Sequence, residues 1–209
     1  NKKNKIRQRL WKVRAKKVIL ATGSIERPMI FDCNDRPGIM LSSAVRKYLN
    51  HYGVKCGNNV VIFSNNDDAY ETALSLHSKG IKIKAIIDIR KESGGELVKK
   101  CVDLGIKIMW KHTIVKAEGH KKINAAIVMK LSNNNNSIVG DKIKITCDLL
   151  CVSSGYTPAV HLFTQSGGKL AFDEKKFYFY PGKTTLDQLS VGACAGIFNL
   201  KKIIHDTYT

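Results

Sequence analysis

Residues 59–89, NVVIFSNNDDAYETALSLHSKGIKIKAIIDI, predict a β-strand, a helix and a second β-strand in direct succession. The run at 59–63 is apolar throughout, which is typical of a strand buried on both faces of a parallel sheet. Residues 69–78 have the composition of a helix, which Gly80 ends, and residues 81–89 form the second strand. Because parallel strands need a helical crossover, this βαβ segment indicates an α/β fold.

The flanking sequence extends this unit in both directions. The segment 41–52 predicts an amphipathic helix with Ser42 or Ser43 as its N-cap and Gly53 at its end. After the second strand the pattern predicts a helix at 92–104 and a strand at 106–109. It then changes to period two, and strands at 113–117, 125–131 and 142–152 form a β-meander with SNNNNS, residues 132–137, as a hairpin loop.

The composition limits the functional classes. The 209 residues are 44% hydrophobic and 25% charged, as in an ordinary globular protein, and no apolar run approaches the roughly 20 residues of a membrane span. The net charge is +18, and residues 1–17 supply nine Lys or Arg without an acid. Aromatic residues are not interleaved with this basic run, so we expect a solvated or partner-facing strip in preference to nucleic-acid binding.

The six cysteines give no sign of a metal or disulfide framework. None belongs to a Cys-x-x-Cys pair, and no histidine cluster lies at zinc spacing. Cys147 and Cys151 are expected on one face of a single strand, roughly 13 Å apart, which is too far for a disulfide. We therefore expect buried or half-buried thiols, no metal site and a reducing cytoplasmic location.

Three short segments share a pattern although they lie far apart in the chain. They are ATG at 21–23, SSGYTPAVHLF at 153–163 and SVGACAG at 190–196. Small residues at a strand end let backbone N–H groups approach a diphosphate, and a following helix adds a favourable partial charge. In this order around a βαβ unit, the segments resemble the flavoproteins with two dinucleotide-binding domains, the relatives of disulfide reductases.

A narrower resemblance covers nearly the whole chain. Residues 7–31, NDRPGIML at 34–41, SNNDDAY at 64–70 and SGYTPAVHLFTQSGGKL at 154–170 resemble the alpha subunits of heterotetrameric sarcosine oxidases. Related opine dehydrogenase and hydrogen cyanide synthase subunits are similar here. The resemblance implies that 1–30 and 154–209 are fragments of a first dinucleotide-binding domain. It implies an inserted, three-layer Rossmann-like domain with a β-meander at 31–153. It also implies a glycine-rich turn before residue 1 and a folate-binding region after residue 209.

The resemblance places cofactor-binding residues at Ala21, Thr22, Gly23, Gly192 and Ala193. Flavin-binding relatives have Gly-Asp at the last motif, and the carboxylate holds the ribityl chain of FAD. Ala193 follows Gly192 here, so that anchor is missing. We therefore expect NAD in this subunit, with FAD as the alternative.

The turn of the inserted βαβ unit lacks the glycines of a dinucleotide site. It reads Ser64-Asn65-Asn66-Asp67-Asp68-Ala69, where G-x-G-x-x-G is needed. Asp67 and Asp68 are expected to satisfy the helix N-terminus. Asp88, at the end of the second strand, is expected to be a solvated acid, and a role as a ribose ligand is the less favoured alternative. We infer that the inserted domain is a degenerate nucleotide-binding fold kept as a scaffold.

No general base or nucleophile stands out, and we assign no catalytic residue. His161 is interpreted as a hydrogen-bonded core histidine in preference to a catalyst. Arg27 is interpreted as part of a structural ion pair in preference to a residue that faces the cofactor or a partner channel. The resemblance implies oxidative demethylation of sarcosine, a small amine, to glycine, a one-carbon unit and hydrogen peroxide. It further implies beta, gamma and delta subunits, with FAD, FMN and tetrahydrofolate in the assembled enzyme. An opine or glycine dehydrogenase subunit, a cyanide synthase subunit and a non-catalytic binding module remain alternatives.

Overall fold

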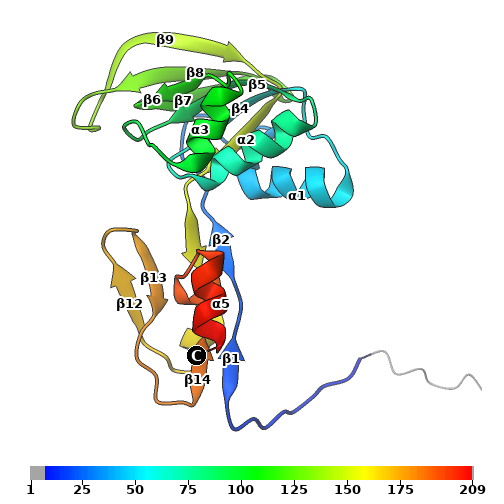
Figure 1. Ribbon diagram of the computed structural model, residues 1–209, viewed down its shortest axis with the longest axis vertical. Helices are drawn as coiled ribbons and strands as arrows, with labels where there is room; N and C mark the ends of the chain where they lie inside the picture. The colour runs from blue at the N-terminus through cyan, green and yellow to red at the C-terminus, as the bar shows by residue number, and fades with distance from the viewer. Residues whose placement is uncertain (1–7, 209) are drawn as a thin grey trace, which may run out of the picture. The chain divides into compact units, whose positions relative to one another are not determined.

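The computed structural model describes residues 8–208, and side chains as far as residue 205. The chain forms two compact units (Figure 1). Unit 1 combines the residues up to 25 with those from 157 onward, and unit 2 comprises 26–156. The passages between the units fall within β2 (Ser24–Glu26) and β11 (Tyr156–Pro158). Residues 1–7, which hold part of the basic run, lie outside the described residues.

Unit 2 is built on a five-stranded parallel sheet of order β3-β10-β4-β5-β6. Its central strands are buried on both faces because their sequences are almost wholly apolar, and this confirms the α/β fold. The strands are β3 (Ile39–Leu41), β10 (Leu149–Ser153), β4 (Asn59–Ser64), β5 (Lys82–Asp88) and β6 (Ile108–Trp110).

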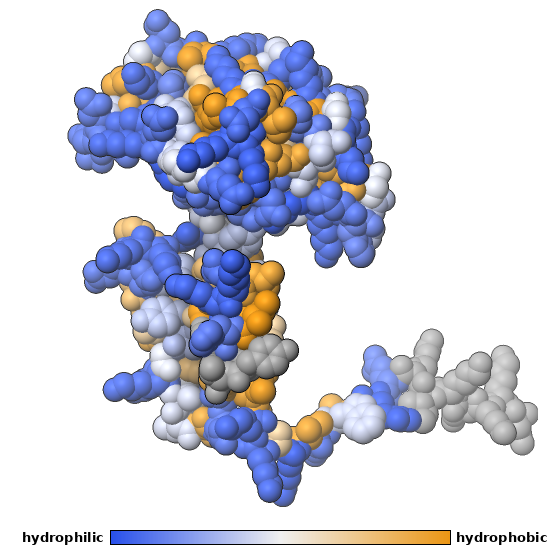
Figure 2. Space-filling view, viewed as in Figure 1, coloured by the Kyte–Doolittle hydropathy of each residue, from blue (hydrophilic) through white to orange (hydrophobic). Residues whose placement is uncertain are grey.

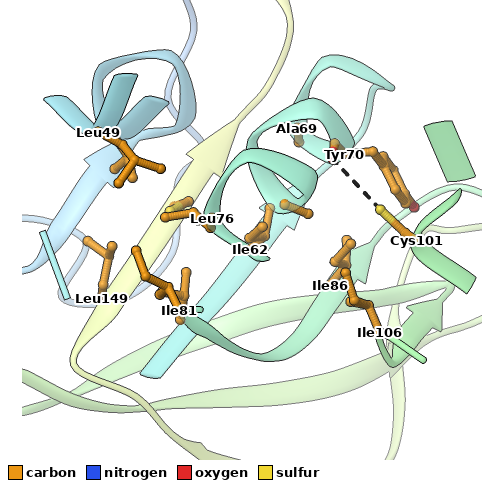
Figure 3. Packing of buried hydrophobic residues seen from close by; sticks show 14 of the residues in the cluster. Leu49, Ile62, Ala69, Tyr70, Leu76, Ile81, Ile86, Cys101, Ile106 and Leu149 are labelled. Carbon is orange, nitrogen blue, oxygen red and sulfur yellow. Dashed lines mark hydrogen bonds between the residues drawn. The ribbon is translucent and has the colours of Figure 1, made fainter. Parts of the chain in front are cut away.

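Three helices cover one face of this sheet (Figure 1). They are α1 (Ser42–Tyr52), α2 (Asp68–Ser78) and α3 (Glu96–Asp103), close to the predicted positions. Figure 3 shows the apolar cluster between helices and sheet, in which the Cys101 thiol donates to the backbone oxygen of Tyr70 at 3.8 Å. Helix α1 ends at Gly53, as predicted, and the φ of 65° at this position suits glycine.

The expected serine caps of α1 are wrong. Leu41 is the N-cap residue and makes no side-chain cap. The carboxylate of Glu26 takes this role instead, accepting hydrogen bonds from the backbone N and the hydroxyl of Ser43 at 2.9 and 2.5 Å. The Ser42 hydroxyl is buried without a partner. An acid brought in from a distant strand thus caps the helix, which a local pattern does not reveal.

A three-stranded antiparallel sheet packs on the other face of the parallel sheet. Its strands are β7 (His112–Gly119), β8 (Ile123–Leu131) and β9 (Ile138–Thr146), and residues 132–137 form the predicted hairpin loop. The expected third strand at 142–152 is wrong, because the chain leaves the meander after Thr146 and enters the parallel sheet as β10. Cys147 therefore lies between two strands and not on one strand with Cys151.

Unit 1 is smaller and centres on two parallel strands, β1 (Val18–Leu20) and β14 (Gln188–Ser190). A hairpin of β12 (Leu170–Asp173) and β13 (Tyr178–Pro181) and the helices α4 (His161–Gln165), η1 (Gly192–Ala195) and α5 (Leu200–Tyr208) complete it. Leu20, Phe163 and Cys194 form its core, with Leu170 packed against them.

The surface is dominated by polar side chains, and Figure 2 shows them over much of the visible face of unit 2. Residues 8–17 have no helix or strand, and every one of their side chains is exposed, including the apolar Leu10 and Trp11. Within the described residues, no helix is both long and apolar enough to cross a membrane.

Candidate functional site: two strand-to-turn edges

The first candidate site lies in unit 1, where β1 and β14 end side by side. The parallel register pairs Leu20 with Ser190, and the backbone N of Val191 donates to the Leu20 oxygen at 2.9 Å. Residues 21–23 and 192–193 follow these two strand ends directly. The structure thereby brings all five predicted cofactor residues, Ala21, Thr22, Gly23, Gly192 and Ala193, to one sheet edge, although about 170 residues separate them in sequence.

Hydrogen bonds tie this edge to the residue after β11. The Thr22 hydroxyl donates to the Ala159 oxygen at 2.7 Å, and the Ala159 N donates to the Gly23 oxygen at 3.0 Å. The Sγ atom of Cys194, which is fully buried, lies 3.0 Å from the Thr22 hydroxyl and 3.6 Å from the same Ala159 oxygen. Ala159 and Cys194 thus position the edge. The sequence motifs grouped the three segments that contain these residues but assigned no role to Ala159 or Cys194, because a motif does not show which side chains and carbonyls will form hydrogen bonds.

The glycines of this edge leave room for a ligand. Gly23 has φ of 73°, and a Cβ built on it would meet no atom within 4 Å. Gly192 has φ of 67°, and a Cβ built on it would meet only the side chain of Ile203, at 3.5 Å. Ala193 is partly exposed and carries a methyl group in place of a carboxylate. An open edge without an acid fits a diphosphate, which needs close approach to the backbone.

The second candidate edge follows β4 in unit 2, and its own side chains fill it. The Asn66 side chain accepts a hydrogen bond from the backbone N of Asp68 at 3.1 Å, and its amide donates to the Ser153 hydroxyl at 3.1 Å. Asp67 is the N-cap residue of α2 but makes no side-chain cap. The expectation that Asp67 and Asp68 satisfy the helix N-terminus is therefore wrong, and Asn66 does so.

The two aspartates bind arginines. Arg90 contacts Asp67 at 2.8 Å and Asp88 at 2.8 Å, so that one guanidinium joins the turn to the end of β5. Asp68 pairs with Arg46 at 3.0 Å and accepts a hydrogen bond from the Tyr156 hydroxyl at 2.7 Å.

Both expectations for Asp88 are wrong. Its side chain is fully buried, so it is not a solvated acid. Its oxygens accept hydrogen bonds from the Arg90 guanidinium and from the Tyr70 hydroxyl, the latter at 2.8 Å, and a carboxylate without exposed surface cannot contact a ribose. Arg90 lies only two residues beyond Asp88, and this spacing was the available signal.

Burial and charge shift the ionisation of this cluster. Burial, reinforced by the Asp88 carboxylate, raises the pKa of Tyr70 well above its usual value. Burial works to lower the pKa of Arg90, but the hydrogen bonds and charges of Asp88 and Asp67 outweigh it and raise that pKa. Burial also raises the pKa of Tyr156, with Asp68 adding to the effect. The network is therefore held in one ionisation state at neutral pH, with the tyrosines protonated and Arg90 charged.

A family comparison decides the class of the protein. The model of the family described as pyridine nucleotide-disulphide oxidoreductase matches residues 1–186. The chain belongs to this family. It also resembles sarcosine oxidase alpha subunits, as the sequence motifs indicated. It is 37% identical over 195 residues to the one of Corynebacterium sp. (strain P-1), covering 92% of this chain and 20% of that protein. For Rhizobium meliloti (strain 1021) the values are 35% over 195 residues, 90% and 18%.

The chain thus spans about a fifth of the length of these curated relatives. A solved structure, the thioredoxin reductase of T. acidophilum, superimposes with a TM-score of 0.65 at 16% identity, covering 90% of this chain and 60% of that one. At this identity the match concerns the fold, and it agrees with the α/β architecture of a pyridine nucleotide-disulphide oxidoreductase.

The sequence analysis also singled out a histidine, an arginine and the six cysteines. His161 is exposed at the start of α4, so the interpretation as a core histidine is wrong. Arg27 donates through Nε to the Ser154 oxygen at 3.2 Å. All six cysteines are free, and each is buried or half-buried as predicted. Among the described residues, no three His, Cys, Asp or Glu side chains are grouped as a metal would require.

Proposed function

We propose that this chain is part of the alpha subunit of a sarcosine oxidase, in which unit 1 holds the diphosphate of NAD and unit 2 is a scaffold. The observation that carries the proposal is the parallel pairing of β1 with β14. It gathers Ala21–Gly23 and Gly192–Ala193 at one edge, where α/β sheets bind dinucleotides.

The residues of this edge suit binding and not bond-breaking chemistry. NAD, when bound, supplies a nicotinamide that accepts or donates a hydride. Gly23 and Gly192 would let the backbone approach the diphosphate, and Thr22 would keep the turn in place through Ala159. None of the five predicted residues has a titratable side chain. Their role is therefore to position the cofactor, and no proton transfer is assigned to them.

The scaffold role of unit 2 rests on the filled edge after β4. A dinucleotide there would have to displace Arg90 from two aspartates, one of them fully buried. Breaking a buried ion pair leaves an uncompensated charge and costs about 3–5 kcal/mol. The absence of glycine from residues 64–69 adds to this penalty, since side chains then separate the phosphates from the backbone.

The activity of the whole protein is proposed from the resemblance. The relatives bear the name sarcosine oxidase subunit alpha, which supports oxidation of a small amine by an assembly of several subunits. We assign the assembled enzyme beta, gamma and delta subunits, with FAD, FMN and tetrahydrofolate outside the segment described. Its products would be glycine, a one-carbon unit and hydrogen peroxide, in a reducing cytoplasm that suits six free thiols.

The nucleotide released on denaturation tests the cofactor proposal. The complete subunit is purified, denatured and filtered, and the released nucleotides are quantified by chromatography. NAD near one equivalent, without FAD, is expected because Ala193 lacks the carboxylate that flavin-binding relatives use. One equivalent of FAD without NAD would overturn this assignment.

An activity assay tests the division of labour between subunits. The complete alpha subunit without partners should produce no sarcosine-dependent peroxide, whereas the assembled enzyme should. Peroxide production by the isolated subunit at the rate of the assembly would show that it contains the catalytic residues, contrary to the proposal.

A further inference from the structure

Unit 2 contains a cavity of about 370 Å³ at the end of β4 opposite to the filled turn. Its walls come from Asn59 at the start of β4, from Lys84 on β5, from residues 122–124 at the start of β8, and from residues 146–148 between β9 and β10. The cavity lies at Asn59, where β4 begins, and the filled turn follows Ser64, where β4 ends. The whole length of β4 therefore separates the two places. The cavity is therefore distinct from both strand-end edges.

A β-bulge directs Lys84 toward this cavity. Val60 pairs with Ile83 and Val61 with Ala85, so Lys84 is an extra residue in β5. The bulge explains why Ile83 packs on the helix side of the sheet and Ala85 on the meander side, although residues two apart in a regular strand share a face. Bulges commonly redirect a side chain at functional sites. Here the bulge places a lysine beside the start of β8.

Backbone and carboxylate hydrogen bonds fix the walls. The backbone N of Cys147 donates to the Asn124 oxygen at 3.0 Å, and that of Asp148 donates to the Asn59 oxygen at 3.0 Å. Asp148 also accepts from the backbone N of Asn58 and of Asn59, at 2.7–3.1 Å. Its carboxylate, the one acid lining the cavity, is thus already engaged by the backbone.

Apart from Asp148, the polar side chains of the cavity have no hydrogen-bond or ion-pair partner in the described part of the chain. Neither Lys84 nor Lys122 forms an ion pair there, and the side chains of Asn59, Asn124 and Thr146 make no hydrogen bond. Ile123 and Cys147 also line the cavity, but almost all of their surface is buried in the apolar core of unit 2. Two ammonium groups, two amides and a hydroxyl therefore line this cavity.

We propose that this cavity binds a small organic oxyanion, a carboxylate or a phosphate ester, whose head contacts Lys84 and Lys122. Charge-assisted hydrogen bonds from ammonium groups are the strong contacts for such oxygens, and amide and hydroxyl donors complete the set. The volume lies at the small end of the range for ligand sites, which favours a compact molecule. This site does not depend on the proposed function of unit 1.

The test titrates the ¹⁵N-labelled full chain with butyrate and, separately, with inorganic phosphate, at pH 7 and constant ionic strength. Saturable shifts are expected at the amides of Asn59, Ile123, Asn124 and Cys147. Saturation by butyrate only would show that the site selects a carboxylate over phosphate. Saturation by both anions would show that the oxyanion head dominates. Either result supports the site, and linear shifts with both anions would overturn it.

The chain offers a matched control for each lysine. Lys84→Ala and Lys122→Ala should each weaken binding about tenfold, the loss of one charge-assisted contact, while Lys82→Ala and Lys121→Ala should change it less than about twofold. All four changes remove one positive charge, and Lys82 and Lys121 lie outside the cavity. Equal weakening by all four would show diffuse attraction and refute the site. The spectrum itself reports folding, and Lys122, in an exposed turn, serves if the bulge variant misfolds.

Discussion

Each unit of this protein contains a place where parallel strands end and turns follow, and the two places differ in the side chains that occupy them. In unit 1 the residues after β1 and β14 are small, uncharged and open, with free space at Gly23. In unit 2 the turn after β4 contains two aspartates held by two arginines. Parallel strands that end together form a natural ligand site in both units. The comparison indicates that side chains, and not the fold, decide which of the two edges leaves room beside the backbone.

The largest expected effect comes from removing the guanidinium that fills the second edge. Arg90→Ala leaves the buried Asp88 carboxylate without its cation, so the free energy of unfolding should fall by about 3–5 kcal/mol. Urea denaturation followed by circular dichroism measures this. The neighbouring, exposed Lys91 is the control, and Lys91→Ala should change stability by less than about 0.5 kcal/mol. A loss below about 1 kcal/mol for Arg90→Ala would mean that Asp88 is not held by this pair.

The hydrogen bond from Tyr70 to Asp88 comes next in size. Tyr70→Phe removes one donor to a buried charge while keeping the ring, so a loss of about 1.5–3 kcal/mol is expected. The comparable bond from Tyr156 to Asp68 is only partly buried, and Tyr156→Phe should cost about 0.5–1.5 kcal/mol. The same denaturation experiment compares them, and an equal or reversed order would contradict the account of burial at this edge.

The wild-type protein should also lose stability in alkali through Tyr70. Its pKa is raised in the folded state, first by burial and then by Asp88, so the unfolded chain releases this proton at lower pH than the folded one. The contribution of Tyr70 to the free energy of unfolding is fully present below the usual tyrosine pKa near 10. It declines as pH rises above that value, by up to about 1.4 kcal/mol per pH unit. Tyr70→Phe should show a shallower decline, and identical slopes would argue against this burial effect.

The smallest effects separate the residue that caps α2 from its neighbour. Asn66→Ala should cost about 0.5–2 kcal/mol, because the Asn66 side chain binds the N of Asp68. Asp67→Ala should cost less than about 1 kcal/mol, since it removes only one half-exposed ion pair with Arg90. Thermal or urea unfolding of both variants distinguishes them. A greater loss for Asp67→Ala would restore the cap to Asp67.

Local patterns were sufficient for the elements with strong periodicity. The apolar run at 59–63 and the stripe at 41–52 produced a strand and a helix where predicted, because burial of these side chains leaves few alternatives. The family motifs likewise pointed to residues that the structure brings to one edge. In both cases the signal lies in a short segment.

The sequence patterns did not predict hydrogen bonds and ion pairs that depend on the folded structure. The run at 142–152 is continuous in its apolar pattern, yet Asp148 breaks it by accepting hydrogen bonds from Asn58 and Asn59, about 90 residues away. Glu26 caps a helix that begins sixteen residues later. Asp88 was misjudged because its burial follows from Tyr70 and Arg90, and no pattern of apolar residues reports an ion pair.

The most direct test of the central claim compares two glycines with the same backbone and the same open surroundings. Gly23 and Gly80 have φ of 73° and 69°, and a Cβ on either would meet nothing within 4 Å. Valine therefore strains both equally, but only Gly23 lies at the proposed cofactor edge. The nucleotide released by denaturing each purified complete subunit is the readout. The account predicts that Gly23→Val loses most of its NAD, whereas Gly80→Val and Asp67→Ala retain it. Loss of NAD from folded Asp67→Ala, with retention in Gly23→Val, would place the cofactor in unit 2 and contradict the account.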